Sequence, residues 1–409
     1  MGEPAAADAA CPRDGSRKHD IISCKFNPSG TSVLATTKTG FLIFVLDREG
    51  AVSLQHEYDV GVEIKFAERL YSTNLVAYVT CENPEVFVVF HCKRRKIVCD
   101  FRYPSTISVV RFNRQRVIVA VKEAIYIHNV RNMQIVQIIK DLPHGLPSNI
   151  MELATSDNCG YLAFPFKTDS GTVRIFDVFQ LQDVSCIQAH QSPIAVVKFD
   201  PTGYRIATAS VRGTCIRVFD SAHGQKLCEF RRGFKEVKMV SLSFSLDNRY
   251  LSATSDSETI HIFKIPVDSN PDNAGFLQSV RNTMTTAGGL LNTEERAFLT
   301  MPSPLHGQYA VGNFGSLSVG VINFLLINPQ GLLYIYSLAE NAEGSGFIRP
   351  VRQVNLQEKK KATSIIISSL NQEDGSGKTK KDDFFIGPSN FESSKTFEIN
   401  DRVVPQSTE

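Results

Sequence analysis

Two consecutive arginines in the segment Phe230-Arg231-Arg232-Gly233 carry the chemistry that phosphate recognition needs. A guanidinium group is planar and always charged, and its paired N–H donors match phosphate oxygens. Neighbouring side chains of an extended segment point to opposite faces, so we expect Arg231 and Arg232 to serve different sides. Gly233 leaves room for a ligand or backbone to approach, and Phe230 is expected to anchor the strand.

Hydroxyl and basic side chains precede and follow this pair. The upstream group contains Thr208, Ser210, Gly213, Thr214 and Arg217, and the downstream group contains Ser255, Thr259 and His261. Hydroxyls and backbone amides bind phosphate and the hydroxyls of a sugar-like ring, while arginine and histidine add charge. The pattern predicts two small anion pockets on one rim, divided by the arginine pair.

A structural interpretation of the same residues stays open. Two arginines and a glycine are common on surfaces, hydroxyls at strand ends satisfy backbone groups, and His261 fits a buried structural role. In that case Glu229 and Glu236 would neutralise the arginines, and the chain would be a protein scaffold. A third class, an enzyme, is disfavoured because no nucleophile–base pair, metal-ligand cluster or glycine-rich phosphate loop occurs; we expect no catalytic residue, metal or cofactor.

The elements that must position these residues recur along the chain with a period of about 40 to 45 residues, which is typical of propeller blades. Alternating strands that end in phenylalanine open the units, at Phe26, Phe66, Phe112, Phe199 and Phe244, and a further unit opens near Met151. Strands with a closing aromatic end them, at Phe44, Phe176, Phe219, Phe263 and Tyr336. We predict an all-β, seven-bladed β-propeller, whose seventh, less regular unit runs from about Phe298 to Leu338.

The expected domain is bounded by polar segments. We assign residues 1–17 to a disordered N-terminus, 18–357 to the propeller and 358–409 to a disordered tail rich in Lys, Asp, Ser and Gln. Residues 266–297 interrupt the blade pattern. Within them Phe276, Leu277, Leu290 and Leu291 could enter a membrane interface; the alternative is a loop packed on the propeller.

Composition limits the remaining function classes. The 44 basic and 42 acidic residues give a net charge of +2, so no global field favours nucleic acid or membranes. The nine cysteines include no Cys-x-x-Cys pair and are expected to be free thiols of a cytosolic protein. No signal peptide or membrane-spanning run is recognisable. Lys93-Arg94-Arg95-Lys96 is interpreted as a solvated loop, and no nucleic-acid partner is expected.

A second basic group, Arg111, Arg114 and Arg116, is expected to alternate on one strand face and to form a partner-binding surface.

The closing and opening strands around the arginine pair also resemble a known family. The segments Ala207–Phe219, Phe230–Gly233 and Ser255–Phe263, together with Phe112–Arg116 and Tyr126–Asn129, resemble the PROPPIN (WIPI) family of divergent WD-repeat propellers. The likeness extends over about residues 20–345 and is most specific in the fifth and sixth blades. Thr208 stands where a serine is expected, which keeps the hydroxyl.

The resemblance implies a function for each pocket. Arg231 would bind one lipid head group with Thr208, Ser210, Gly213, Thr214, Arg217 and also His190; Arg232 would bind a second with Gly233, Ser255, Thr259 and His261. The implied ligands are phosphatidylinositol 3-phosphate and phosphatidylinositol 3,5-bisphosphate. The implied role is peripheral binding to phagophore and endosomal membranes, an inserting loop in the sixth blade, and recruitment of autophagy lipid-transfer and conjugation proteins.

Overall fold

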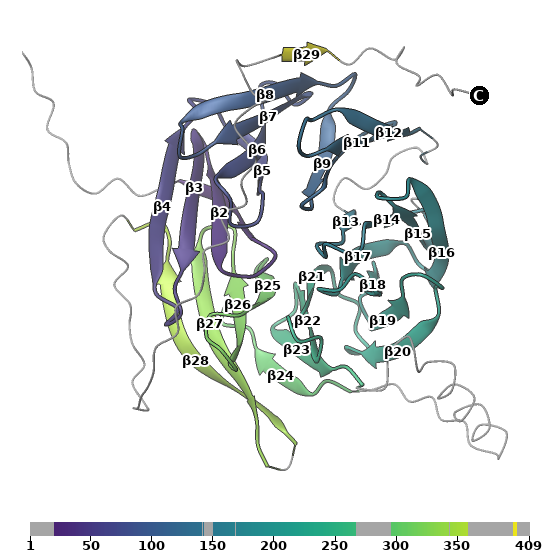
Figure 1. Cartoon of the computed structure of the whole chain (residues 1–409). Helices are drawn as coiled ribbons and strands as arrows, with labels where there is room; N and C mark the ends of the chain where they lie inside the picture. Colours follow the sequence, from purple (N-terminus) through teal and green to yellow (C-terminus); the bar gives the residue numbers. More distant parts are fainter. Residues whose placement is uncertain are drawn as a thin grey trace, which may run out of the picture.

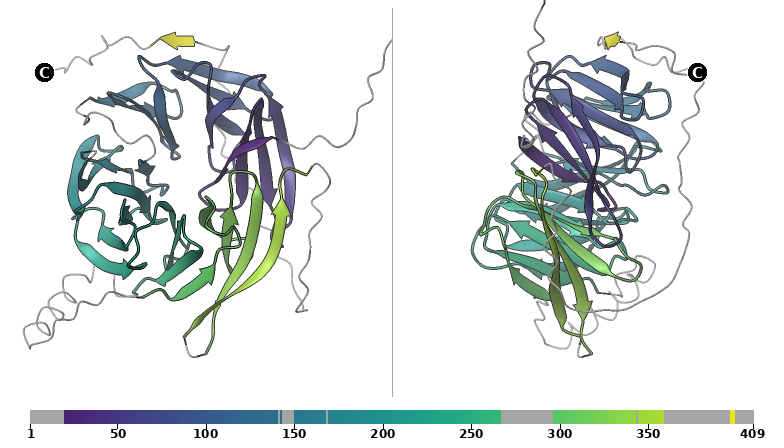
Figure 2. Two further views of the ribbon diagram at one scale, coloured as in Figure 1. Left: turned by 180° about the vertical axis from the view of Figure 1, so that it is seen from behind. Right: turned by 90° about the vertical axis from the view of Figure 1, so that its left-hand side faces the viewer.

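Strands account for all the regular secondary structure of the described residues. The computed structural model describes residues 20–140, 142, 150–167, 169–266, 296–342, 344–358 and 396–398, the last three by their backbone alone. Apart from β29 (Thr396–Glu398), these strands form seven antiparallel sheets whose members follow one another in the sequence. Figure 1 shows the sheets arranged in a ring, and Figure 2 shows the same ring from behind and from the side. The predicted seven-bladed β-propeller is confirmed.

The bounds of the sheets follow the repeat. The first sheet comprises β1 (Ile21–Phe26), β2 (Ser32–Thr37), β3 (Gly40–Leu46) and β4 (Val52–Asp59). The second comprises β5 (Ile64–Arg69), β6 (Leu75–Thr80), β7 (Val86–His91) and β8 (Lys96–Arg102). The third comprises β9 (Ile107–Phe112), β10 (Arg116–Val121), β11 (Ile125–Asn129) and β12 (Ile135–Ile139). The fourth comprises β13 (Glu152–Leu153), β14 (Tyr161–Pro165), β15 (Gly171–Asp177) and β16 (Gln182–His190).

The remaining three sheets contain the candidate site and the ring closure. The fifth comprises β17 (Ile194–Phe199), β18 (Arg205–Ser210), β19 (Cys215–Asp220) and β20 (Lys226–Arg231). The sixth comprises β21 (Met239–Phe244), β22 (Tyr250–Ser255), β23 (Thr259–Lys264) and β24 (Leu299–Pro302). The seventh comprises β25 (Val311–Gly315), β26 (Ile322–Ile327), β27 (Leu332–Glu340) and β28 (Gly346–Asn355).

The second strand of each blade is packed on both faces. Every residue of β2 and β22 is buried, and so is every residue of β18 except its first. Their sequences, SVLATT, YLSATS and RIATAS, are rich in small side chains, which let neighbouring sheets approach closely. The outer strand β4 is instead largely exposed: Val52 is its one buried residue, and the other seven are exposed or half-buried.

A polar residue directly after the first strand of a blade fixes the next turn. The Asn27 Oδ1 accepts hydrogen bonds from the backbone N–H groups of Thr31 and Ser32, both at 2.9 Å. Asn113, Asp200 and Ser245 occupy the same place after Phe112, Phe199 and Phe244 and accept equivalent bonds. Such side-chain acceptors satisfy turn amides that would otherwise be left unpaired.

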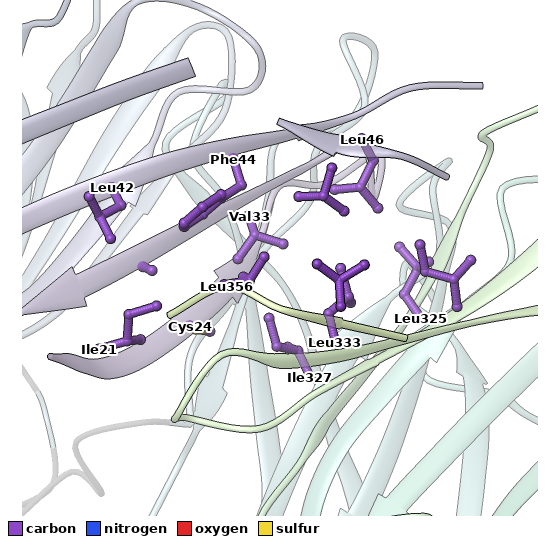
Figure 3. Close-up of a cluster of buried hydrophobic side chains, with 14 of the residues drawn as sticks. Ile21, Cys24, Val33, Leu42, Phe44, Leu46, Leu325, Ile327, Leu333 and Leu356 are labelled. Carbon is purple, nitrogen blue, oxygen red and sulfur yellow. The ribbon is translucent and has the colours of Figure 1, made fainter. Parts of the chain in front are cut away.

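The ring closes by side-chain packing between the first and seventh blades. The two sheets each consist of consecutive strands, and the purple first blade lies beside the green seventh blade in Figure 1. Ile21, Cys24 and Val33 pack against Leu325, Ile327 and Leu333 in one apolar cluster (Figure 3). At Gly30, whose φ is +68°, a Cβ would lie 2.6 Å from the carbonyl oxygen of Phe314. The backbones of the two blades therefore touch where only glycine fits.

The start of the seventh unit was placed wrongly from sequence. Leu299–Pro302 pairs with β23 and completes the sixth blade, so the seventh blade begins at Val311 and extends through β28 to Asn355. The interruption thus joins the third and fourth strands of blade six. Phe276, Leu277, Leu290 and Leu291 lie outside the described residues, as do residues 1–17.

A short strand from the C-terminal tail extends the second blade. β29 (Thr396–Glu398) pairs in parallel with β8, with Phe397 opposite Phe101. None of the described residues form a helix that is long and apolar enough to cross a membrane. The eight cysteines between Cys24 and Cys228 are all unpaired, as predicted for this part of the chain.

Candidate head-group site on the rim of blades five and six

The arginine pair lies where the fifth blade ends. Phe230 is fully buried and lies opposite Ile216 in the β19–β20 pairing, so the predicted anchoring role is confirmed. Arg231 is the last residue of β20, and Arg232 is the first residue beyond it. Both arginine side chains are partly exposed. The buried aromatic therefore holds the end of the strand, and the two charges stay at the surface.

The two arginines make different contacts. The Arg231 guanidinium lies over the Phe234 ring, 5.1 Å from its centroid. The Arg232 Nε donates to the Gly213 carbonyl oxygen at 2.8 Å, and its Nη2 donates to the Lys235 carbonyl oxygen. Burial lowers the pKa of Arg232, although the Asp256 carboxylate opposes this effect.

The carboxylates considered as neutralising partners have other neighbours. Glu229 forms an ion pair with Arg217, with 3.0 Å between the carboxylate oxygen and Nε, and a second with Lys226. Burial raises the Glu229 pKa, but hydrogen bonds and charge from Arg217 and Lys226 outweigh it and bring the pKa to about 2. Glu236 pairs with Arg212 at 2.7 Å.

Three of the upstream residues come together between blades four and five. His190 ends β16, and its Nε2 lies 2.9 Å from the Thr208 Oγ1. The Thr208 hydroxyl donates to the Arg217 carbonyl oxygen at 3.4 Å, and the Arg217 Nη1 donates to the Ala189 carbonyl oxygen at 2.7 Å. Burial, and secondarily the Arg217 charge, lower the His190 pKa to about 4. We refer to His190, Thr208 and Arg217 as the upstream cluster.

The other upstream residues form the turn beside Arg232. Gly213 has a φ of +61°, and a Cβ there would lie 2.3 Å from the Val237 carbonyl oxygen. The Thr214 carbonyl oxygen accepts from the N–H groups of Arg232 at 2.9 Å and Gly233 at 3.3 Å. Ser210 closes the same turn, because its carbonyl oxygen accepts from the Gly213 N–H at 2.9 Å. Gly213 and Thr214 therefore position the arginine pair through their backbone.

The downstream residues form a chain of hydroxyls that ends at an imidazole. The Ser255 Oγ lies 2.8 Å from the Ser257 Oγ, and the Thr259 Oγ1 lies 3.2 Å from the His261 Nε2. Burial, and secondarily the Arg232 charge, lower the His261 pKa to about 4. We refer to Ser255, Thr259 and His261 as the downstream cluster.

Two hydroxyls of this region were missed from sequence. Ser257 bridges Ser255 and Thr259 through bonds of 2.8 Å and 3.5 Å, and alternation two residues after Ser255 could have revealed it. The Thr300 Oγ1 lies 3.3 Å from the His261 Nδ1. Thr300 lies opposite His261 in the β23–β24 pairing. No local pattern could have found Thr300, because the long connection separates it from β23.

The basic group of the third blade is arranged differently from the prediction. Arg111 lies in β9, Arg114 in the following turn and Arg116 in β10, so the prediction that they share one strand face is wrong. The Arg111 Nε donates to the Met151 carbonyl oxygen at 2.9 Å, and Arg114 pairs with Asp157 at 3.0 Å. The Arg116 Nε donates to the Val178 carbonyl oxygen at 3.0 Å. All three arginines contact the fourth blade.

Within the part of the chain that the structure describes, no three His, Cys, Asp or Glu side chains gather as a metal site requires.

Comparison with known proteins identifies the family. The chain matches the PROPPIN family over residues 21–354. It belongs to the PROPPIN family. WD repeat domain phosphoinositide-interacting protein 2 of Mus musculus is 34% identical over 365 residues, which cover 86% of this chain and 81% of that protein. Autophagy-related protein 18 of Caenorhabditis elegans is 36% identical over 253 residues, 58% of this chain and 61% of that protein.

A solved PROPPIN structure has the same fold. The Kluyveromyces lactis Atg21 propeller, determined in complex with the coiled coil of AgAtg16, superposes with a TM-score of 0.65 at 22% sequence identity. The match covers 81% of this chain and 98% of the Atg21 chain. The family match and the 34% identical relative confirm the resemblance inferred from the sequence, and the solved structure agrees with the fold.

Proposed function

We propose that this PROPPIN is a phosphoinositide effector that binds phosphatidylinositol 3-phosphate and phosphatidylinositol 3,5-bisphosphate at two rim sites on either side of Arg231 and Arg232. In this role it acts peripherally on phagophore and endosomal membranes and brings autophagy proteins to the forming autophagosome. Its relatives carry names that state phosphoinositide interaction and autophagy. No catalytic step is part of the proposal.

The observation that carries the proposal is the matched pair of clusters beside the arginines. Each cluster has a buried histidine whose pKa is about 4, a hydroxyl within 3.2 Å of the imidazole, and a nearby arginine that lowers the histidine pKa. Neutral imidazoles and hydroxyls can donate single hydrogen bonds, and the arginines supply positive charge. An inositol ring bearing phosphates and hydroxyls needs this combination.

The two sites would act together on one membrane. Each head-group contact can be weak, because a second contact on the same bilayer is governed by a high effective concentration and raises avidity by about 10²-fold or more. Phe276, Leu277, Leu290 and Leu291 are kept as proposed membrane-inserting residues of the blade-six connection. They would add apolar contact to the electrostatic one.

The partner surface is a separate part of the proposal. Arg111, Arg114 and Arg116 reach from the third blade to the fourth and are proposed to contribute to binding an autophagy conjugation or lipid-transfer protein. The Atg21 relative, whose solved structure contains a coiled coil of Atg16, makes a protein partner of this kind reasonable.

A lipid-independent scaffold is the alternative that one observation favours. Arg232 donates to two carbonyl oxygens, of Gly213 and Lys235, and so has a structural role in the turn. If that role were its only one, the arginine pair would stabilise the fold without contacting lipid.

Flotation on liposomes separates the two functions. Vesicles with and without a few per cent phosphatidylinositol 3-phosphate are mixed with wild type and with the Arg231→Thr/Arg232→Thr variant, and circular dichroism checks the fold. Lys93→Thr/Arg94→Thr is the matched control, because it removes two exposed positive charges from the second blade. The proposal predicts lipid-dependent flotation of wild type and control alone. If the folded double-arginine variant floats as wild type does, the lipid-binding proposal is wrong and the scaffold function is the one that remains.

A further inference from the structure

An exposed aromatic ring follows the arginine pair directly. Phe234 is 87% exposed, whereas Phe230, four residues earlier, is fully buried. Among the large apolar side chains of the described residues, only Val319, at 97%, is more exposed. Moving so exposed an aromatic ring from water into an apolar environment lowers the free energy of the protein.

The backbone around Phe234 forms a braced tip. The turn of residues 211–214 and the loop of residues 232–238 lie side by side, because the Arg232 N–H donates to Thr214 and the Val237 N–H donates to Arg212. The Arg212–Glu236 ion pair also joins them. Val211, on the first turn, is 51% exposed. The tip therefore presents two apolar side chains, Val211 and Phe234, on a hydrogen-bonded base.

Positive charge surrounds this apolar tip. Residues 211–214 and 231–238 include five basic side chains, Arg212, Arg231, Arg232, Lys235 and Lys238, and one acidic side chain, Glu236, a net charge of +4 (5 − 1). The Arg231 guanidinium lies over the Phe234 ring at 5.1 Å, in the range of a cation–π contact. An apolar tip with basic neighbours matches the interface of an anionic bilayer, where acyl chains and anionic head groups meet.

We propose that Phe234, with Val211, enters the head-group and acyl boundary of an anionic membrane beside the two lipid sites. The inference rests on the proposed function and adds an apolar contact to it. It also fixes orientation. β20 ends on the face of the ring where β21 begins, and β23 runs parallel to β21 and ends on the opposite face. Phe234 and the point where the blade-six connection leaves β23 thus lie on opposite faces of the ring, and both contact one bilayer only if the ring stands on its edge, with blades five and six toward the membrane.

The absence of tryptophan from the sequence makes a direct test possible. Phe234→Trp introduces a single fluorophore, and Leu54→Trp, at a 43% exposed position of β4 across the ring, is the matched control. With vesicles of phosphatidylcholine, phosphatidylserine and phosphatidylinositol 3-phosphate, emission from position 234 should move to shorter wavelength and be quenched by brominated acyl chains. Emission from position 54 should do neither. Membrane-bound protein with unquenched emission at position 234 overturns the inference, and points to an apolar protein partner for the tip.

Phe234→Ser separates this inference from the proposed function. The variant should lose about tenfold in affinity for the vesicles, since part of a phenylalanine's burial is lost. Its affinity for soluble inositol 1,3-bisphosphate should equal that of wild type. Equal vesicle affinities for variant and wild type overturn the membrane role of Phe234 and leave the proposed function intact. Wild type that binds neither vesicles nor the soluble head group overturns the proposed function and this inference together.

Discussion

The rings of Phe230 and Phe263 stack with their centroids 4.8 Å apart and an angle of 26° between their planes. Phe230 belongs to the outer strand of blade five and Phe263 to the third strand of blade six. The contact joins the two blades one residue before Arg231 and two residues after His261. Stacked rings contribute beyond the area they bury, so this pair connects the fold energetically to the geometry of the candidate site.

Replacing Phe230 with alanine should destabilise the propeller and disturb lipid binding together. A fully buried phenylalanine lost to a cavity costs about 3–5 kcal/mol in the free energy of unfolding. Chemical denaturation measures this change, and liposome flotation measures the binding. The control is Phe166→Ala, at a 42% exposed position, which should cost less than about 1 kcal/mol. Equal costs for the two variants would show that the Phe230–Phe263 contact does not stabilise the fold.

The two glycines of the site should differ in how much stability they lose when replaced with alanine. Gly213 has a positive φ, and an added Cβ would lie 2.3 Å from a backbone oxygen, so Gly213→Ala should lower the free energy of unfolding by more than about 1 kcal/mol. At Gly233 an added Cβ meets nothing within 4 Å. Gly233→Ala should therefore change stability by less than about 0.5 kcal/mol.

Lipid binding gives Gly233 its own test. If a head group approaches its backbone, Gly233→Ala should weaken flotation while the thermal unfolding curve stays that of wild type. Unchanged flotation would show that this glycine has no role in ligand approach, and a large loss of stability would contradict the open space around it.

Buried histidines should make stability depend on pH. Burial lowers the pKa of His128, His190 and His261 from 6.5 to about 4. Between these values the unfolded chain binds protons that the folded chain does not, so the free energy of unfolding should fall as pH falls through this window. Urea denaturation from neutral pH to about pH 4 measures it.

His128→Gln provides the specific check of that prediction. His128 is fully buried between the Tyr103 hydroxyl at 2.7 Å and the Met133 carbonyl oxygen at 3.0 Å. The variant should be less stable than wild type at neutral pH and should lose less stability on acidification. Parallel pH profiles of variant and wild type would exclude His128 as a source of the dependence.

The sequence predicted the repeat better than the ends of its units. Phenylalanine ends the first strand of four blades, at Phe26, Phe112, Phe199 and Phe244, and a polar turn residue follows each of them. The period that they set was enough to infer the number of blades and the fold class, although Phe66 lies inside β5 and not at its end as expected. The seventh blade was misplaced because β24 follows a long connection and carries only four residues. Local alternation cannot tell a delayed fourth strand from the first strand of a new blade.

The basic group of blade three shows a second limit. Arg111, Arg114 and Arg116 were assigned to one strand because their spacing alternates, yet Asn113 turns the chain between them. Its place after Phe112 matches that of Asn27 after Phe26, so comparison of the repeats could have predicted this turn from the sequence. In the candidate site, the two groups of hydroxyls and basic side chains could be identified from the sequence. The contact of Thr300 with His261 depends on strand pairing and needed the structure.

The central claim is that the arginine pair divides two head-group sites, and calorimetric titration with water-soluble, short-chain phosphatidylinositol 3-phosphate tests it most directly. Wild type should bind two molecules per chain. Arg217→Gln, in the upstream cluster, and His261→Gln, in the downstream cluster, should each leave one site, and the folded double variant should bind none. A wild-type stoichiometry below two, or a double variant that binds as wild type does, would contradict the two-site account.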